Sequence, residues 1–164
     1  MRIKCIASSE IESKIELGAN SALSSMDIRK KEDSLELNRI ISGEMSREEQ
    51  QELLEAFDNP CQERDYLIVH SCHEFTSVCP KTGQPDFAAI TIEYVADQKC
   101  LELKSLKLYF FSFRNMGIYY EGVINRILDD LTAVVKPRFM RVKGDFGIRG
   151  GFSSVITAEY KERQ

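Results

Sequence analysis

The sequence lacks several features that mark common classes of protein. No stretch of its 164 residues approaches the roughly 20 apolar residues that a membrane span requires. The apolar run in the segment 1–7 is too short for a signal peptide. Acidic residues outnumber basic ones, giving a net charge of −4 and a pI near 5.3, so no general basic face is available for nucleic acid. We therefore expect a cytoplasmic protein with neither a membrane nor a nucleic-acid partner.

Two ligand-binding motifs are missing as well. No Gly-x-Gly-x-x-Gly pattern follows a strand, so a nucleotide cofactor would not sit on a Rossmann unit. The five cysteines include no Cys-x-x-Cys pair and make an odd count, which indicates free thiols. One alternative is a zinc site, whose sulfur and imidazole ligands would come from Cys61, His70, Cys72, His73 and Cys79. Because part of this set lies on an expected strand whose side chains alternate between faces, we predict that no metal is bound.

Length and composition favour one folded domain over residues 1–164. Apolar residues make up 43% of the chain, which is ample for a core. Residues 8–45 show no repeat or low-complexity tract, and we expect only strands and loops there. Residues 1–60 are assigned to the same domain without any recognisable motif.

The secondary structure is readable after residue 46. Ser46 and Glu49 form a capping box that opens a helix to about Phe57. A second, longer helix begins at about Tyr120, and Pro137 ends it. Strands are expected over 65–70, 87–95, 138–146 and 152–160, the last two joined by the glycine-rich segment 147–151. This order of elements predicts an α+β fold.

The segment from Cys79 to Asp86 carries the chemistry that stands out most. A thiol attacks an electrophilic carbon as the thiolate, and a positioned acid must then protonate the atom that takes up the charge. Cys79 and Asp86 fit these two roles. Pro80 and Pro85 fix the backbone φ angle and remove two donors, so we expect a constrained loop between the pair.

A longer pattern around this segment resembles a known family. It comprises Glu74–Ala88 with Cys79-Pro-Lys-Thr-Gly-Gln-Pro-Asp86, then Glu102-Leu-Lys-Ser-Leu-Lys-Leu-Tyr109, then Ser112–Asn115, together with Glu121, Val142–Phe146 and Arg149-Gly150. These blocks, over residues 64–160, are similar to the QueF family of nitrile oxidoreductases, which reduce 7-cyano-7-deazaguanine with NADPH in queuosine biosynthesis.

The resemblance implies a covalent mechanism. Cys79 would add to the nitrile carbon and form a thioimide, with Asp86 as proton donor and thiol activator. Two NADPH molecules would then supply two hydrides, giving the aminomethyl product. Burial beside the ligand would raise the pKa of a carboxyl group and basic neighbours would lower it, and both effects stay open for Asp86.

The resemblance also implies the ligand contacts. Glu121 would accept two hydrogen bonds from the amino and lactam edge of the substrate, and the segment Leu101, Glu102 and Leu103 would contact the same ligand. Lys104, Lys107 and Arg114 would bind the phosphates of NADPH, with Arg149 adding to them from another loop. Glu121 as a helix N-terminal carboxylate, and the two lysines as solvated charges on a helix, are the structural alternatives.

One position departs from the family pattern. Best-known members carry histidine directly before the substrate-binding glutamate, whereas this chain has Tyr120. A phenol loses its proton near pH ~10, against ~6.5 for imidazole, and is a poorer proton shuttle at neutral pH. We therefore hypothesise that His73 supplies an imidazole from the other side of the pocket.

The family resemblance extends to fold and assembly. It implies a tunneling fold, in which helices cover one face of an antiparallel sheet and subunits join edge to edge into a barrel, with pockets between them. A homo-oligomer of two stacked pentamers is expected. Two other functions stay open: an archaeosine-type amidinotransferase relative, and a module that binds a purine or pterin without catalysis.

Overall fold

The computed structural model describes residues 34–161, and the chain divides between Asn38 and Arg39 into two compact units. Residues 39–60 lie in the same unit as the motif-bearing part. That the residues before 39 belong to this domain stays a prediction. Residues 34–41 are helical, so the expectation of strands and loops is wrong there, whereas residues 8–33 lie outside the described residues. None of the helices within residues 34–161 has the length and hydropathy needed to cross a membrane.

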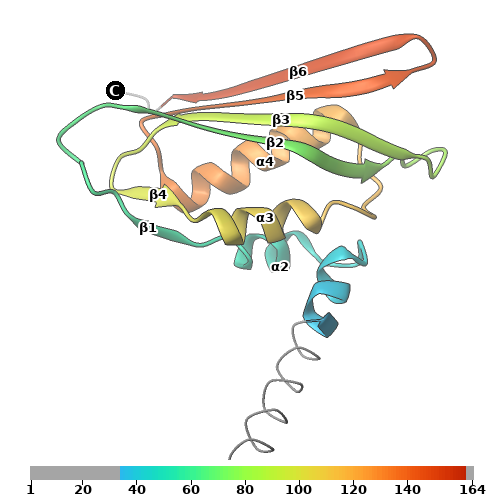
Figure 1. The fold of residues 1–164 in the computed structure, drawn as a ribbon, viewed down its shortest axis with the longest axis horizontal. Coiled ribbons are helices and arrows are strands. Elements are labelled where there is room, and N and C mark those ends of the chain that lie inside the picture. Colours follow the sequence, from blue (N-terminus) through green and yellow to red (C-terminus); the bar gives the residue numbers. More distant parts are fainter. Residues whose placement is uncertain (1–33, 162–164) are drawn as a thin grey trace, which may run out of the picture. The chain divides into compact units, whose positions relative to one another are not determined.

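A four-stranded antiparallel sheet is the centre of this unit. Its strands, in spatial order, are β2 (Leu67–Val78), β3 (Pro85–Val95), β5 (Phe139–Arg149) and β6 (Phe152–Lys161). Figure 1 shows α3 (Leu103–Phe111) and α4 (Tyr120–Val135) on the same side of this sheet. Sheet and helices together form the predicted α+β fold. All four predicted strands are present, and β2 runs eight residues beyond its expected end at His70 because it pairs with β3 along its length.

Between residues 89 and 94 the sequence alternates apolar Ile90, Ile92 and Tyr94 with Ala89, Thr91 and Glu93, which predicts a half-buried strand, and the structure confirms this pattern in β3. Ile90, Ile92 and Tyr94 are buried against the helices, with exposed fractions of 0%, 1% and 0%. Their neighbours Thr91 and Glu93 are partly exposed on the other face. A period of two with one buried face is what an antiparallel sheet covered on one side requires.

The first predicted helix begins where expected and ends early. The Ser46 hydroxyl accepts from the Glu49 amide, and the Glu49 side chain accepts from the Ser46 amide, so the capping box is confirmed. The helix, α2 (Arg47–Glu52), stops five residues before Phe57. Phe57 instead lies in β1 (Ala56–Asp58), where it pairs with Cys100 of β4 (Lys99–Leu101). A strand partner distant in sequence overrides the local helical pattern.

The second predicted helix is confirmed at both ends. α4 starts at Tyr120, and Lys136 ends it in the left-handed conformation with φ of 43°. Pro137 follows directly, as a residue that cannot continue a helix. Apolar residues recur at helical spacing along the predicted helix, and six of them are buried in α4: Val123, Ile124, Ile127, Leu128, Leu131 and Val135.

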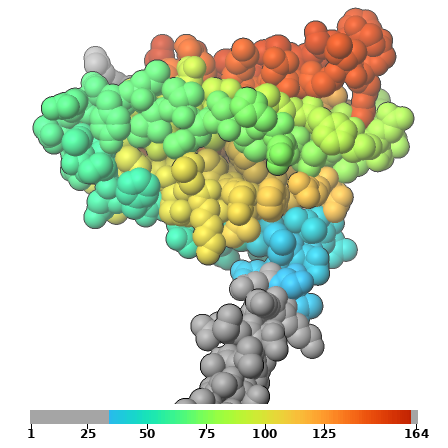
Figure 2. All heavy atoms as spheres, in the orientation of Figure 1, coloured from blue at the N-terminus to red at the C-terminus, as the bar shows by residue number. Residues whose placement is uncertain are grey.

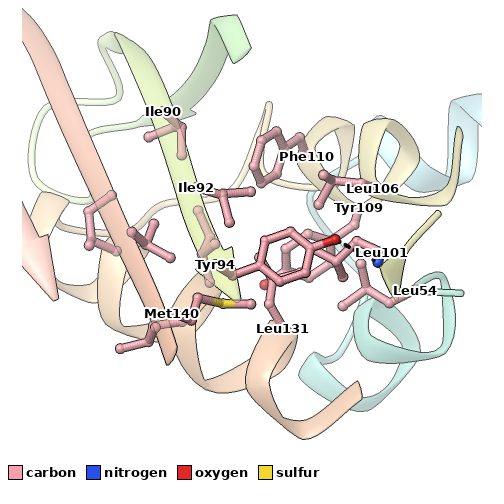
Figure 3. Close-up of a cluster of buried hydrophobic side chains, with 14 of the residues drawn as sticks. Leu54, Ile90, Ile92, Tyr94, Leu101, Leu106, Tyr109, Phe110, Leu131 and Met140 are labelled. Carbon is pink, nitrogen blue, oxygen red and sulfur yellow. Dashed lines mark hydrogen bonds between the residues drawn. The ribbon is translucent and has the colours of Figure 1, made fainter. Parts of the chain in front are cut away.

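The core lies between the sheet and the helices (Figure 3). Tyr94 and Tyr109 are fully buried in it. The Tyr94 hydroxyl accepts a hydrogen bond of 3.1 Å from the Leu101 amide, which ties β4 to the centre of the sheet. Buried tyrosines need such partners, because an unpaired hydroxyl in an apolar core costs free energy.

Candidate active site

Cys79 and Asp86 lie at the two sides of the tight loop between β2 and β3. The Cys79 amide donates to the Gln84 carbonyl and the Gly83 amide donates to the Cys79 carbonyl, both at 2.9 Å. Gly83 has a φ of +70°, which a residue with a side chain rarely adopts. The predicted constrained loop is therefore confirmed.

A β-bulge in β2 sets the face on which Cys79 lies. Cys72 pairs with Ile90 and Phe75 pairs with Ala88, so three steps on β2 match two on β3. The extra residue switches the inward positions of β2 from even to odd numbers, as the burial of Phe75 and Ser77 shows. Cys79 continues this odd series beyond the strand end. Without the bulge, the same alternation would turn Cys79 to the opposite face from Asp86.

A second bulge, in β5, does the same for Arg149. Phe146 pairs with Ser154 and Arg149 pairs with Phe152, again three steps against two. Regular alternation from the buried Phe146 would have placed Ile148 inward, but Ile148 is 78% exposed. The bulge brings Arg149 to the helix-covered face, where Asp86 also points.

The two bulges and the start of α4 converge on one cavity of about 270 Å³. Five of the predicted site residues line it: Cys79, Asp86, Tyr120, Glu121 and Arg149. The remaining wall comes from Pro80, Ile118 and Tyr119. The cavity thus brings together a thiol, a buried carboxyl group and an exposed carboxylate, which is the combination that the family resemblance implies for nitrile chemistry.

The thiol of Cys79 is activated by its own loop. Hydrogen bonds from the Thr82 hydroxyl and from the backbone of Lys81 and Thr82 lower the pKa of Cys79 from 9.0 to about 7, with a smaller contribution from Arg149. Each of these donors stabilises the thiolate more than the thiol. A large fraction of Cys79 is therefore thiolate at neutral pH.

The carboxyl group of Asp86 is held by one ion pair and one hydrogen bond. Its side chain is 4% exposed, and the Arg149 guanidinium forms an ion pair with Oδ1 at 2.7 Å. The Tyr120 hydroxyl donates to the same oxygen at 2.8 Å. Tyr120 is itself fixed by stacking on Phe146, with ring centroids 4.0 Å apart. Burial and the neighbouring Asp86 raise the pKa of Tyr120, so this phenol keeps its proton at neutral pH.

Glu121 lies in the first turn of α4, next to Tyr120, and its side chain is exposed at the cavity. A carboxylate there has a favourable interaction with the helix dipole. It is also free to accept hydrogen bonds from a ligand. The position of Glu121 is therefore compatible with a role in ligand binding and with a purely structural role as a helix N-terminal carboxylate.

The segment Leu101 to Leu103 lies elsewhere within one chain. Leu101 is buried, and the Glu102 side chain accepts from the Lys104 and Ser105 amides at the N-terminus of α3. Leu103 is 57% exposed. These three residues border a second hollow, of about 340 Å³, with Phe57, Tyr66 and His70. These residues lie at the N-terminal end of α3. The nine residues of that helix, about 13 Å in length, separate them from the residues 118–121 that line the cavity of Cys79.

The predicted cations other than Arg149 follow α3 and its C-terminal end. Lys104 and Lys107 are exposed on that helix, a position that suits phosphate binding as well as the alternative of solvated charges. Lys107 borders a hollow of about 240 Å³ whose floor includes Leu103, Leu106 and Phe110. This hollow runs between β2 and α3, which lie next to each other in Figure 2. Arg114 is exposed beside another depression, with its guanidinium 5.0 Å from the Phe111 ring.

His73 is not brought to Cys79 within one chain. It is exposed at the bulge of β2, and six residues of extended strand span about 20 Å. It does not line the cavity of Cys79. The hypothesis that it supplies an imidazole from the far side of this pocket therefore has no support from the arrangement of a single chain, in which Tyr120 contacts Asp86 instead.

The zinc alternative has no geometric support in residues 34–161. No group of three or more metal-ligating side chains comes together there. The described cysteines, Cys61, Cys72, Cys79 and Cys100, are all free thiols.

Sequence reasoning missed three residues of the site: Thr82, Ile118 and Tyr119. The signal for Thr82 was its place before Gly83 in the constrained loop. Ile118 had no local signal, because its amide donates to the Val78 carbonyl at 3.0 Å across a contact between distant segments.

Comparison with known proteins agrees with this architecture. The crystal structure of the apo archaeosine synthase QueF-Like superposes with a TM-score of 0.55 at 22% sequence identity, covering 60% of this chain and 96% of that one. At this identity the likeness concerns the fold. The protein thus has the tunneling fold, with a cysteine and an aspartate in its candidate site.

Relatives found by sequence similarity identify the family of this protein. The family model described as QueF-like protein matches residues 85–164. An NADPH-dependent 7-cyano-7-deazaguanine reductase of Nitrosococcus oceani is 59% identical over 109 residues, which are 66% of this chain and 84% of the relative. One of Magnetococcus marinus is 57% identical over 117 residues, 71% of this chain and 91% of the relative. The chain belongs to the family of NADPH-dependent 7-cyano-7-deazaguanine reductases.

Proposed function

We propose that this protein reduces the nitrile of 7-cyano-7-deazaguanine to the aminomethyl group with NADPH, through a thioimide on Cys79. One observation carries the proposal: a cysteine whose pKa is lowered to about 7 shares a cavity with the buried carboxyl group of Asp86. Its relatives named as reductases of this nitrile give the substrate.

The covalent step needs one nucleophile and one proton carrier. The thiol proton of Cys79 passes to Asp86, and the sulfur forms a bond to the nitrile carbon as one C–N π bond breaks. Asp86 then gives the proton to the nitrogen, so the net change is addition of S–H across the triple bond. The tight loop matters here because it keeps thiol and carboxyl group at one end of the cavity.

Reduction consumes two hydrides and two protons per nitrile. NADPH, when bound, supplies the hydrides. Once the first hydride is on the thioimide carbon, Cys79 leaves as thiolate from the resulting tetrahedral carbon, and the imine that remains takes the second hydride. A pKa near 7 makes this thiolate a good leaving group. Asp86 is placed to return a proton to the nitrogen.

Glu121 would orient the substrate. The amino and lactam N–H groups of a deazaguanine point the same way, and one carboxylate accepts from both. Glu121 is exposed at the same cavity as Cys79, which suits this role.

The hollow between β2 and α3 fits part of NADPH. Lys107 at its rim and Lys104 one turn before it offer two positive charges for phosphates. The floor of Leu103, Leu106 and Phe110 is apolar, as a ring-binding surface usually is. Arg114 lies beyond the C-terminal end of α3 and adds a third positive charge to those of Lys104 and Lys107.

A complete site would need a second subunit. Within one chain, the cavity of Cys79 and the hollow beside Leu101, Glu102 and Leu103 lie apart. β2 and β6 are the outer strands of the sheet, and Leu67 and Val69 on β2 are 58% and 50% exposed. Pairing such edges joins subunits and removes an aggregation hazard. A homo-oligomer, in the form of two stacked pentamers, and a cytoplasmic location remain part of this proposal.

The experiment combines absorbance and intact mass. The purified protein is mixed with 7-cyano-7-deazaguanine, with and without NADPH, and the nicotinamide absorbance is followed. We expect two cofactors oxidised per substrate, and an adduct on Cys79 when NADPH is withheld. Cys79→Ala should lose both signals, whereas Cys61→Ala, at another partly buried thiol, should keep them.

Other outcomes would separate the alternatives. An adduct without oxidation would favour amidinotransferase-type chemistry. If neither an adduct nor oxidation is observed, the enzyme proposal is overturned and a binding module remains.

A further inference from the structure

The two oxygens of Asp86 have different surroundings. Oδ1 meets both the Arg149 guanidinium, at 2.7 Å, and the Tyr120 hydroxyl, at 2.8 Å. Among the residues that the structure describes, no hydrogen-bond donor contacts Oδ2. Oδ2 is also absent from the buried polar atoms that lack a partner, so it is accessible from outside. The carboxyl group therefore has one occupied oxygen and one that opens to the cavity.

Arg149 is itself held in place. The same NH2 group that pairs with Asp86 lies 3.2 Å from the Pro85 carbonyl, to which it donates, and 3.5 Å from that of Gln84. The Gln84 carbonyl belongs to the loop that carries Cys79, and the Pro85 carbonyl to the first residue of β3 directly after it. The guanidinium thus links the loop, the carboxyl group and the β5–β6 hairpin, and the bulge of β5 makes this contact possible.

From these contacts we infer that Arg149 is a positioning residue, which together with Tyr120 fixes Oδ1 of Asp86 so that Oδ2 exchanges the proton with Cys79 and the nitrile nitrogen. The inference rests on the proposed function and deepens it. A proton bound to Oδ1 would compete with the Arg149 cation and the Tyr120 hydroxyl already there, whereas Oδ2 has free lone pairs. In the covalent step the thiol proton moves to Oδ2, and from Oδ2 to the nitrogen.

The same geometry gives Tyr120 a role other than proton shuttling. Its hydroxyl proton points at Oδ1, and its ring is held by Phe146. It orients the carboxyl group and keeps its own proton. Arg149, as part of this arrangement, has a different role from the one in NADPH phosphate binding that the sequence suggested.

The charged and titratable groups that share the cavity with Cys79 add a smaller effect to that of its own loop. They are Asp86, Tyr119, Tyr120, Glu121 and Arg149, and Lys81 is exposed in the adjoining loop. Arg149 is the cation that lines the cavity itself. Removing it leaves two carboxyl groups near the thiol, which disfavours the thiolate.

The test compares Arg149→Gln and Arg149→Lys with the matched control Arg141→Gln. Arg141 is on the same strand and pairs with Glu93 and Glu159 on the other face of the sheet. Three quantities are measured: the pH midpoint of Cys79 alkylation without substrate, the rate of nitrile adduct formation without NADPH, and the KM for NADPH. Thermal unfolding checks that each variant is folded.

Arg149→Gln is expected to move the alkylation midpoint to higher pH and to slow adduct formation about 10- to 100-fold, with the KM for NADPH unchanged. Arg149→Lys should restore much of the midpoint, since the charge is kept, but less of the rate, since an ammonium lacks the guanidinium fork. Tyr120→Phe should slow adduct formation without changing its pH dependence. Arg141→Gln should match the wild type.

A double variant tests the bulge itself. Exchanging the two residues, Ile148→Arg with Arg149→Ile, moves the guanidinium to the exposed side and should resemble Arg149→Gln. An unchanged alkylation midpoint and adduct rate in Arg149→Gln, with a raised KM for NADPH, would overturn the inference in favour of cofactor binding.

The proposed function and this inference fail in different ways. If the wild type forms no adduct, the reductase proposal fails, and the alkylation midpoints still decide whether Arg149 acts on the site. If the wild type reacts and all variants resemble it, only the inference fails.

Discussion

Arg47 on α2 and Asp130 on α4 form an ion pair of 2.7 Å, although the side chain of Asp130 has no exposed surface. The Tyr109 hydroxyl donates to the other oxygen of Asp130 at 2.8 Å, and Gln51 donates at 2.6 Å. The carboxylate thus joins α2, α3 and α4. Burial and the adjacent Asp130 raise the pKa of Tyr109 well above its usual value, so this donor stays protonated.

We predict that Asp130→Ala lowers the free energy of unfolding by about 1–3 kcal/mol, because it leaves the buried Tyr109 hydroxyl without an acceptor and removes the partner of Arg47 and Gln51. Urea unfolding at a fixed protein concentration measures this change. Asp129→Asn, at the neighbouring exposed position, is the control and should stay within about 0.5 kcal/mol of the wild type. Equal effects of the two substitutions would show that the network adds little to stability.

The fraction of Cys79 that is thiolate at neutral pH should depend on the Thr82 hydroxyl. The Thr82 hydroxyl is the main cause of the lowered pKa of Cys79, so Thr82→Val should raise that pKa. The thiolate fraction falls as pH decreases below the pKa, and a rise of one unit would slow alkylation at pH 7 about 5-fold. Mass spectrometry of the Cys79 peptide across pH gives the midpoint. Thr157→Val, exposed on β6, is the control, and an unshifted midpoint in Thr82→Val would assign the activation to the backbone donors.

Glu121 should determine substrate binding more than chemistry. In Glu121→Gln, the amide presents one acceptor and one donor group where the ligand edge offers two donors. We expect the KM for the nitrile to rise about 10- to 100-fold, which corresponds to about 1.5–3 kcal/mol for a charged hydrogen bond. Steady-state kinetics and a direct binding titration check this. Glu55→Gln, exposed near α3, should have no effect, and a loss confined to kcat would contradict a binding role.

Lys107 should contribute to the binding of NADPH and not to the reaction of Cys79 with the nitrile. We expect Lys107→Gln to raise the KM for NADPH several-fold and to weaken its dependence on salt, because one charge pair with a phosphate is lost. The rate of adduct formation without NADPH should be unchanged. Lys143→Gln, on the open face of β5, controls for net charge. A slower adduct in Lys107→Gln would place this lysine at the nitrile instead.

Local patterns predicted most of the elements. The capping box at Ser46, the alternation along β3 and the apolar positions of α4 depend on neighbours in sequence, and all three are confirmed. The loop between Cys79 and Asp86 was predictable for the same reason, since its prolines and Gly83 restrict the backbone directly. The end of α2 was not, because the pairing of Phe57 with Cys100 is a contact between distant segments.

The sequence by itself determined which residues carry the chemistry: a cysteine, an aspartate and a glutamate in a recognisable family pattern. Only the tertiary structure decided which of them meet. Two bulges, in β2 and in β5, turn Cys79 and Arg149 to the face of Asp86, and neither bulge has a signature in a single strand. A bulge exists only as a mismatch in register between two strands, so its position depends on packing across the whole sheet.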